Sequence, residues 1–552
     1  MPSSGRRATG LAALVATGLW AGPLGYYPTY RETDSILTSL QQKYPHLVKR
    51  MALTPKTLEN RDILAVKVSS SPDADNHKPE ALISGVQHAA EPIGAAVIRD
   101  DLVYLCENYG KDPEVTWLLD NRQIWFVPVM NPDGYEFIAN GGDKMWRKNR
   151  RPNAGGSFGV DLNRNYPFKW GYDNVNSSPT PTAINYRGPS PASEPETKAM
   201  MAFVNQHRFR TWQNHHSPND VLVIPFGYDY KARLPQRDSL VYEALCQGQQ
   251  AHYGRFKKWG PSFIAYDGWA LNGGTEDWGW SDSATYRVYT IISEIGKDYW
   301  ETDAAAREVS QKMRGAELHM IQSAGFYPLV QGLAVTDTCQ ACNRNGIANP
   351  GETVRIKVAI RNQSVVDTTV QVKGFLGSAS TYLTWPDSAG EYGSMPPLAV
   401  AGNDADAFTV ALALGTPPGQ KIPLRMRMTW ELNAVTYEKI LPCTLTVGPV
   451  GAGIATPGST SDRAVSAARQ STGWVRFSRP RTSGLPGNPV PMQLKIYAPN
   501  RLIRVFPPAS ASASEVLWDK TDGNGMRVGP GVYIAVWVFP TGRISTRLAL
   551  TD

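Results

Sequence analysis

His88 and Glu91 stand three positions apart in the stretch GVQHAAEP (85–92), which directly follows the apolar run 81–84. Just past the end of a strand, this spacing lets an imidazole nitrogen and a carboxylate oxygen reach one cation. Zinc accepts such a mixed set, and a catalytic zinc ordinarily has three protein ligands and a fourth position open to water. The pair alone is weak evidence because such a pair also arises by chance. The remaining ligand and the catalytic groups must come from elsewhere in the chain.

Five further stretches carry polar side chains near predicted strands and turns. In chain order they are NPDGYE (131–136) with KMWRKNR (144–150), VDLNRNY (160–166), QNHHS (213–217), GGTEDW (273–278) and TIISEI (290–295). The third of them places His215 and His216 far downstream of the first pair, and either histidine could be the third ligand. Two ligands close in sequence and one distant ligand are the usual pattern of an open catalytic zinc site.

Together and in this order, the stretches resemble the zinc metallocarboxypeptidases of the pancreatic carboxypeptidase A/B type, over residues 26–327. The resemblance implies one Zn²⁺ per catalytic domain, bound by His88, Glu91 and His216, with water at the fourth position. It also implies the fold of that family, a mixed central sheet flanked by helices.

The resemblance bears on the choice between the two adjacent histidines. Alignment on the downstream stretch IPFGY (224–228) favours His216 as the ligand, and His215 is then expected to be a hydrogen-bonded neighbour. Asp161 matches the carboxylate that orients a zinc-binding imidazole and sets its tautomer.

The groups that would carry out hydrolysis also follow from the resemblance. Glu294 matches the general base and acid, since a carboxylate beside an activated water can take its proton and pass it to the leaving amine. Arg147 matches the arginine that stabilises the tetrahedral oxyanion. Asn163 and Arg164 match the pair that grips the terminal carboxylate, for which a planar guanidinium is well shaped. This clamp implies an exopeptidase whose substrates are peptide or protein C-termini.

Glu276 stands where the family's pocket-base residue separates apolar from basic C-terminal side chains. A carboxylate at that place would pair with Lys or Arg and would disfavour a buried apolar group. We therefore expect a preference for basic C-terminal residues. The alternative is that the Glu276 side chain points elsewhere or pairs with a neighbour.

Two positions depart from the family pattern. The family often carries an arginine where this chain has Ala90, so one contact to the substrate is missing. The family's mobile tyrosine falls on Trp269, which can cover a substrate but has no phenolic hydroxyl. Tyr266 lies three residues earlier and could take the role through a different loop path. Both aromatic residues are therefore candidates for substrate binding.

The elements that must position these groups alternate between strands and longer helices from residue 26 to 327, a pattern typical of an α/β domain. The predicted strands are 62–68, 81–86, 123–129, 221–224 and 286–292, and the predicted helices are 35–44, 93–107, 194–206, 239–253 and 303–323. We expect this region to form the catalytic domain.

The remainder of the chain has a different pattern. Short alternating strands fill residues 333–447 and predict a β-sandwich, and residues 463–552 hold a second β pattern. The stretch 448–462 between them is a linker by its Gly, Ala, Pro, Ser and Thr content. Both β regions are similar to bacterial Ig-like modules, and the second resembles those at the ends of secreted enzymes. That similarity implies two all-β Ig-like domains and a cell-surface or export partner.

The N-terminus and the cysteines indicate an exported protein. Residues 1–22 are a predicted signal peptide, because two arginines precede an apolar core that is too short to span a bilayer comfortably. An uncleaved N-terminal anchor is the alternative. Five cysteines fit an oxidising compartment, with a local disulfide between Cys339 and Cys342, or a bridge from this pair to Cys443, as the expected pairings.

We therefore expect a secreted or periplasmic bacterial zinc carboxypeptidase that is a monomer. Nucleic acid is not an expected partner, because the net charge of +7 is small for 552 residues and the longest basic cluster, 146–151, is local. One alternative is a carboxypeptidase that acts on cell-wall peptides. Another is a surface-adhesion protein on an inactive peptidase scaffold, which zinc content would distinguish from an enzyme.

Overall fold

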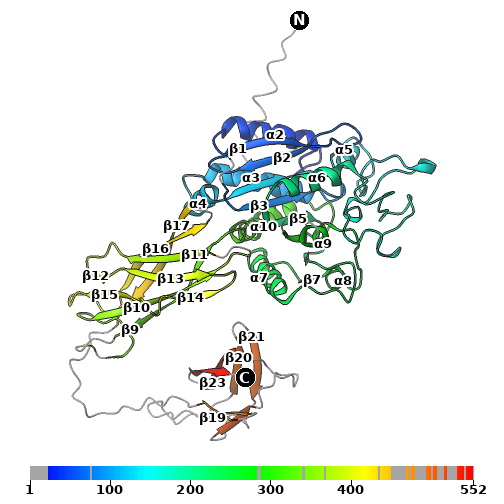
Figure 1. Ribbon diagram of the computed structural model, residues 1–552. Coiled ribbons are helices and arrows are strands. Elements are labelled where there is room, and N and C mark those ends of the chain that lie inside the picture. Colours follow the sequence, from blue (N-terminus) through cyan, green and yellow to red (C-terminus); the bar gives the residue numbers. More distant parts are fainter. Residues whose placement is uncertain are drawn as a thin grey trace. The chain divides into compact units, whose positions relative to one another are not determined.

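The computed structural model describes residues 23–74, 77–281, 287–337, 342, 344–365, 369–432 and 435–448, and the strands between Ala468 and Leu550. The predicted signal peptide lies outside these residues. The chain forms two compact units, Met1–Gly451 and Ala452–Asp552 (Figure 1). Within the described part, we find no helix with the length and apolarity needed to cross a membrane.

The catalytic region is built on an eight-stranded mixed sheet, in the order β1-β2-β4-β3-β5-β8-β6-β7 (Figure 1). Its strands are β1 (Val48–Leu53), β2 (Ile63–Val68), β3 (Glu80–Gly85), β4 (Gln123–Val127), β5 (Phe209–His216), β6 (Val221–Val223), β7 (Lys258–Gly260) and β8 (Tyr289–Glu294). The pairs β3–β4, β3–β5, β5–β8 and β6–β7 are parallel, and the other neighbours are antiparallel. The mixed sheet expected from the sequence is confirmed.

Helices cover both faces of this sheet. They are α2 (Tyr30–Lys43), α3 (Ile93–Asn108), α4 (Pro113–Asn121), α5 (Pro132–Ala139), α6 (Pro195–Gln206), α7 (Gln236–Tyr253), α8 (Ser262–Ala265), α9 (Thr275–Ser281) and α10 (Asp303–Ser323). Successive residues of β2 point to opposite faces of the sheet. Leu64 and Val66 pack with α2 and α3 on one face, and Ile63 and Ala65 pack with α6 on the other. Because β2 is buried on both faces, its residues are apolar except for Lys67.

Helix α2 begins five residues earlier than predicted. Thr29 is its N-cap, because the Thr29 hydroxyl accepts from Glu32 N and the Glu32 carboxylate accepts from Thr29 N. This reciprocal capping box satisfies two of the amide donors that a helix N-terminus leaves free. The sequence Thr-x-x-Glu could have indicated this start.

A β-sandwich follows the catalytic region within the same compact unit. One sheet has the order β12-β15-β10-β14 with β9 paired to β10, and the other has the order β13-β11-β16-β17. Its strands are β9 (Pro328–Thr336), β10 (Thr353–Asn362), β11 (Thr369–Gly377), β12 (Leu383–Asp387), β13 (Ala389–Met395), β14 (Val400–Gly402), β15 (Phe408–Leu412), β16 (Lys421–Leu432) and β17 (Val435–Thr446). Strand β16 alternates buried and exposed residues, as expected for one face against a core.

The second compact unit also consists of strands. They form the sheets β18-β19-β22 and β21-β20-β23-β24, with β18 (Ala468–Ser471), β19 (Trp474–Ser478), β20 (Gln493–Ala498), β21 (Arg501–Phe506), β22 (Glu515–Trp518), β23 (Gly531–Phe539) and β24 (Gly542–Leu550). Most of the predicted linker lies outside the described residues. The β character of the C-terminal region is confirmed, whereas its Ig-like identity stays a prediction.

Cysteine pairing is settled in part. Cys342 is disulfide-bonded, and Cys106, Cys246 and Cys443 are free. The bridge to Cys443 is therefore wrong, and the predicted local pairing of Cys342 with Cys339 stays a prediction, because Cys339 lies outside the described residues.

A polar and aromatic contact joins α4 to the sandwich strand β17. Lys439 Nζ lies 2.7 Å from Glu114 Oε2 and 4.2 Å from the ring centre of Trp117. Trp117 Nε1 donates to the Glu438 carbonyl oxygen at 2.5 Å, and Tyr327 donates to Glu114 Oε1 at 2.6 Å. Since Lys439 is 6% exposed, its charge depends on Glu114 for compensation.

Replacing Glu114 by Gln is expected to lower the free energy of unfolding by about 2 kcal/mol, because the buried Lys439 ammonium loses its counter-charge. Because the Glu114 side chain is 35% exposed, the expected loss of stability is smaller than for a fully buried ion pair. Urea denaturation followed by tryptophan fluorescence measures this loss. The control is Glu438→Gln, next to Lys439 on β17, which breaks the exposed pair between Glu438 and Arg427 of β16. Its free energy of unfolding should change by less than about 0.5 kcal/mol. Equal effects of the two substitutions would contradict the assignment.

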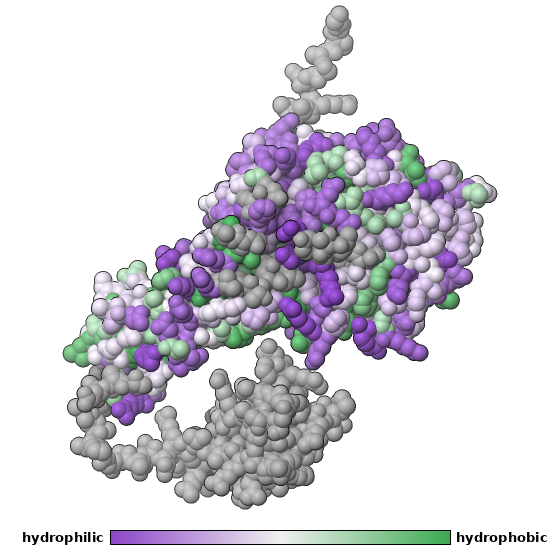
Figure 2. All heavy atoms as spheres, viewed as in Figure 1, coloured by the Kyte–Doolittle hydropathy of each residue, from purple (hydrophilic) through white to green (hydrophobic). Residues whose placement is uncertain are grey.

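On the face drawn in Figure 2, exposed apolar residues are scattered among hydrophilic ones. The most exposed large apolar side chains, Val175, Leu414 and Trp269, lie in three separate loops. Isolated exposed apolar residues of this kind are ordinary in water-soluble folds.

Candidate active site

The carboxyl ends of β3, β5 and β8 meet at one edge of the sheet. His216 is the last residue of β5 and is paired in register with Glu294, the last residue of β8. His88 and Glu91 lie in the turn between β3 and α3. Because adjacent parallel strands end at the same edge, residues far apart in the sequence are brought together there.

The turn after β3 has an unusual backbone. Val86 adopts φ +50°, a conformation that a β-branched residue rarely takes. Met130 N and Asn131 N donate to the carbonyl oxygens of Gly85 and Val86, each at 3.0 Å, and hold this conformation in place. Strain of this kind is stored at functional sites when the surroundings impose it. The turn directs His88 towards the strand ends.

His88, Glu91 and His216 form a group whose ligand atoms all lie within 4.8 Å of one another. His88 Nδ1 lies 3.0 Å from Glu91 Oε1 and 3.0 Å from His216 Nδ1, and His216 Nδ1 lies 2.8 Å from Glu91 Oε2. All three side chains are buried. Two imidazole nitrogens and a carboxylate are a donor set that suits zinc, whereas calcium and magnesium prefer oxygen ligands alone.

In each imidazole, the nitrogen that faces away from the shared centre, Nε2, has polar neighbours. His88 Nε2 lies 3.1 Å from Asp161 Oδ1, and His216 Nε2 lies 3.0 Å from Gln87 Oε1. The Asp161 carboxylate can only accept, so His88 Nε2 carries the proton and His88 Nδ1 presents a lone pair to the shared centre. His216 Nε2 has both an acceptor, Gln87 Oε1, and a donor, Asn214 Nδ2 at 3.1 Å, as neighbours, and its Nδ1 faces the same centre. Burial lowers the pKa of His216 to about 4, so this ring is neutral at pH 7, as a metal ligand must be.

Arg147 borders the group and is held by two carboxylates. Its Nε donates to Asp161 Oδ2 at 3.0 Å, and its NH1 donates to Glu91 Oε1 at 3.2 Å. Burial raises the pKa of Asp161, but Arg147 and His88 outweigh it and hold that pKa well below its usual range. Asp161 therefore stays ionised and orients His88 and Arg147 together.

Glu294 faces the same centre and is bonded to Tyr266, whose hydroxyl donates to Glu294 Oε1 at 2.6 Å. Burial, followed by the charge of Glu91, raises the pKa of Glu294 well above its usual range. Trp269, in contrast, is 72% exposed. Of the two aromatic candidates, the structure brings Tyr266 to the site and leaves Trp269 at the surface.

Asn163 and Arg164 lie in the short 3₁₀ turn Leu162–Arg164, whose first amide groups are capped by Asp161. Asn163 Oδ1 accepts from Thr275 N and Thr275 Oγ1, both at 2.9 Å. This fixes the amide group so that its Nδ2 is the end left for a ligand. Arg164 Nε donates to the Asn176 carbonyl oxygen at 2.9 Å, and the Arg164 side chain is 13% exposed.

Glu276 is fully buried, and neither of its carboxylate oxygens has a hydrogen-bond partner among the described residues. Its neighbour Asp277 is satisfied by Gly227 N at 2.8 Å and Tyr228 N at 3.2 Å. Burial raises the pKa of Glu276 to about 7, although the nearby Arg164 lowers it. Gly274 leaves room for this carboxylate, since a Cβ at that position would lie 2.6 Å from Glu276 Oε2.

His215 points to the other face of β5, because side chains alternate along a strand. Its Nδ1 lies 2.8 Å from Ser293 Oγ, and its Nε2 contacts Glu317 of α10. It is therefore separate from the metal-binding group, in keeping with the role expected for it from the sequence.

Several site residues were not singled out from the sequence. Gln87 and Thr275 stand next to predicted site residues in the same stretches, so proximity in sequence was the available signal. Tyr299 follows β8, and after burial the charge of Glu91 raises its pKa, which places it near the metal-binding group. Its position depends on the path of a loop, for which the sequence carries no motif.

Comparison with known proteins gives concordant results. A family model described as zinc carboxypeptidase matches residues 33–309. The metallocarboxypeptidase A-like protein of Trichophyton verrucosum is 35% identical over 233 residues, covering 40% of this chain and 52% of that protein. Carboxypeptidase A2 of Rattus norvegicus is 32% identical over 265 residues, covering 47% of this chain and 61% of that protein. This chain thus spans little more than half the length of these relatives.

Among solved structures, the complex of bovine thrombin-activatable fibrinolysis inhibitor with tick carboxypeptidase inhibitor is similar. The sequence identity is 24%, the TM-score is 0.47, and the match covers 54% of this chain and 97% of that chain. The residues matched by the family model, 33–309, include His88, Glu91 and His216.

Proposed function

Because the chain belongs to the zinc carboxypeptidase family, we propose that it hydrolyses the last peptide bond of peptides and proteins. The observation that carries this proposal is the convergence of ligand atoms of His88, His216 and Glu91 within 4.8 Å of one another, beside the carboxylate of Glu294, which is bonded to Tyr266. These residues would hold Zn²⁺, which supplies Lewis-acid polarisation of the scissile carbonyl and of the attacking water.

The chain's own residues would perform the proton transfers and bind the substrate. Asn163 Nδ2 and the Arg164 guanidinium hold the terminal carboxylate and set the last peptide bond against Glu294. The Glu294 carboxylate takes a proton from the attacking water and gives it to the leaving amine. Arg147 stabilises the oxyanion that forms at the carbonyl oxygen. Tyr266 orients Glu294 through its 2.6 Å hydrogen bond.

We further propose that the protein is exported and that its C-terminal β regions are Ig-like modules with a cell-surface or export partner. The predicted signal peptide 1–22 supports export. Tyr26 and Tyr27 support it too, because both are buried and Tyr26 N donates to Asp303 Oδ1 at 3.0 Å. Packing of the catalytic region thus begins directly after the predicted signal.

Release of amino acid from two blocked dipeptides, one ending in Arg and one in Phe, tests the proposed activity. Both reactions are run with and without a zinc chelator and with re-addition of zinc. We expect chelator-sensitive release that zinc restores. If zinc-loaded protein released neither residue, the proposal of a standard carboxypeptidase would fail.

We also propose that Glu276 sets a preference for basic C-terminal residues. Its carboxylate is buried without a partner, so an arginine or lysine side chain of the substrate would satisfy it, whereas an apolar side chain would leave it unpaired. Replacing Glu276 by Gln is expected to lower the ratio of kcat/KM for Arg over Phe about 100-fold, or ~2.7 kcal/mol.

The same residue predicts a pH dependence. The Glu276 carboxyl, with a pKa of about 7, is mostly neutral at pH 6 and mostly ionised at pH 8. The preference for Arg over Phe should therefore rise between these pH values in the wild type and stay flat in Glu276→Gln. A preference for Phe at pH 8 would keep the proposed mechanism and exclude this role for Glu276.

A further inference from the structure

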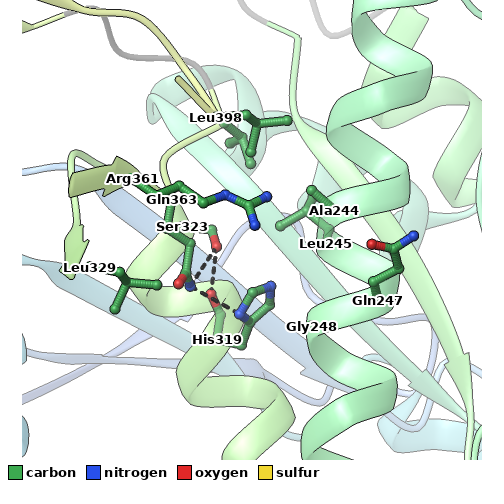
Figure 3. A pocket seen from close by; sticks show the side chains of 11 residues that line it. Ala244, Leu245, Gln247, Gly248, His319, Ser323, Leu329, Arg361, Gln363 and Leu398 are labelled. Carbon is green, nitrogen blue, oxygen red and sulfur yellow. Dashed lines mark hydrogen bonds between the residues drawn. The ribbon is translucent and has the colours of Figure 1, made fainter. Parts of the chain in front are cut away.

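A cavity of about 190 Å³ lies where helices α7 and α10 meet the β-sandwich (Figure 3). None of its lining residues belongs to the metal-binding group or the substrate clamp. Leu245 of α7, Leu329 of β9, Val365 and Leu398 supply apolar walls. The volume is smaller than the ~300–1,000 Å³ of pockets for drug-sized ligands, but far larger than one water needs. A small organic molecule fits this size.

Of the described residues that line this cavity, Arg361 is the one with a permanent charge, and none is acidic. Among the described residues, the Arg361 guanidinium has no ion pair and no hydrogen-bond partner. Figure 3 shows it extending from β10 towards Ala244 and Leu245 of α7. A partly buried guanidinium beside apolar walls lacks both counter-charge and full hydration, so an anion at this place is favoured.

His319 of α10 supplies a second donor. Gln363 Nε2 lies 2.9 Å from His319 Nδ1, so Nδ1 is the acceptor and Nε2 carries the proton. That Nε2 is buried without a hydrogen-bond partner, and the side chain is 8% exposed. Burial, followed by the nearby His252, lowers the pKa of His319 to about 4, so the ring is neutral at pH 7, while the Ala244 carbonyl oxygen opposes this shift without meeting the distance and angle of a hydrogen bond.

We propose that this cavity binds a short aliphatic carboxylate, with its carboxylate between the Arg361 guanidinium and the His319 Nε2–H. The aliphatic part packs against Leu245, Leu329 and Leu398. An inorganic anion would satisfy the two donors but would leave the apolar walls in contact with water, which is why the organic anion is favoured. The proposal does not depend on the proposed peptidase activity.

Calorimetric titration of the full chain with isovalerate tests this site. Because the catalytic clamp also binds carboxylates, the titration is run in parallel on an Arg164→Met variant, in which the clamp is disabled. We expect saturable binding that persists in Arg164→Met and weakens at least tenfold in Arg164→Met/Arg361→Met. The matched control replaces Arg355, an exposed arginine on the same strand β10, by Met and should change Kd less than twofold.

Two ligand controls and one further variant complete the test. Isovaleramide, which has nearly the same shape without the charge, should bind at least tenfold more weakly than isovalerate, and Ala244→Leu should block binding by filling the cavity. Circular dichroism confirms that each variant is folded. Equal binding of isovaleramide, equal effects of the Arg355 and Arg361 substitutions, or binding of sulfate but not isovalerate would each overturn the proposal.

Discussion

Replacing Glu294 by Gln is expected to lower kcat about 1,000-fold, equivalent to ~4 kcal/mol of barrier, with little change in KM. The amide keeps the size of the side chain and can still accept the 2.6 Å hydrogen bond from Tyr266. It cannot take a proton from water. The fall in kcat therefore measures the contribution of proton transfer, because the packing of the side chain is kept. Steady-state kinetics with a blocked dipeptide measure both constants.

Zinc content provides the control for this substitution. Glu294 is outside the metal-binding group, so zinc in Glu294→Gln should stay at one equivalent per chain. Glu308→Gln, which removes an exposed carboxylate paired with Lys312 on α10, should change kcat less than twofold. If zinc-loaded Glu294→Gln kept more than a tenth of the wild-type kcat, another group must be the base.

The sequence predicted several strands of the central sheet, including β3 and β8 of the site, because their signals are local. Residues 62–68 and 81–86 are mostly apolar, as is typical of buried strands in a sheet with two covered faces, and both overlap observed strands. Helix α10 matches its predicted bounds, since Thr302 caps it and its apolar positions recur with helical period. These elements could be located without knowledge of the rest of the fold.

Strand β5 could not be recognised from its local sequence. It carries Arg210, Gln213, Asn214 and two histidines, although every residue of the strand except Arg210 is buried. This polar composition does not indicate a buried strand. The side chains are tolerated there because His215 bonds to Ser293 and Asn214 bonds to Gln87, partners that are distant in sequence. Such pairings follow from the register of the sheet, which no single stretch encodes.

The path of the segment 262–270 likewise could not be predicted from the sequence. Motif spacing places the family's tyrosine at Trp269, yet Tyr266 reaches Glu294. The short helix α8 and Gly268, with φ +109°, set the direction of this loop, and a glycine backbone is compatible with many paths. Spacing along the sequence therefore cannot decide which aromatic ring enters the site.

Replacing His216 by Ala is expected to abolish activity and weaken zinc binding by well over about 100-fold. Loss of a hydrogen-bond partner behind a ligand already costs about 10–100-fold in metal affinity, and loss of the ligand itself costs more. Competition with a chromogenic chelator measures the zinc affinity. The same measurement on His215→Gln is the matched control, because the two histidines are adjacent and both fully buried.

The two variants should therefore separate zinc binding from stability. In His215→Gln the hydrogen bonds to Ser293 and Glu317 are disturbed on the far face of β5, so the protein should lose about 2 kcal/mol of stability while it binds one equivalent of zinc. In His216→Ala the larger loss is in zinc affinity. The reverse result, with zinc lost in His215→Gln and kept in His216→Ala, would show that β5 is shifted by one residue, since such a shift exchanges the faces of every side chain along the strand.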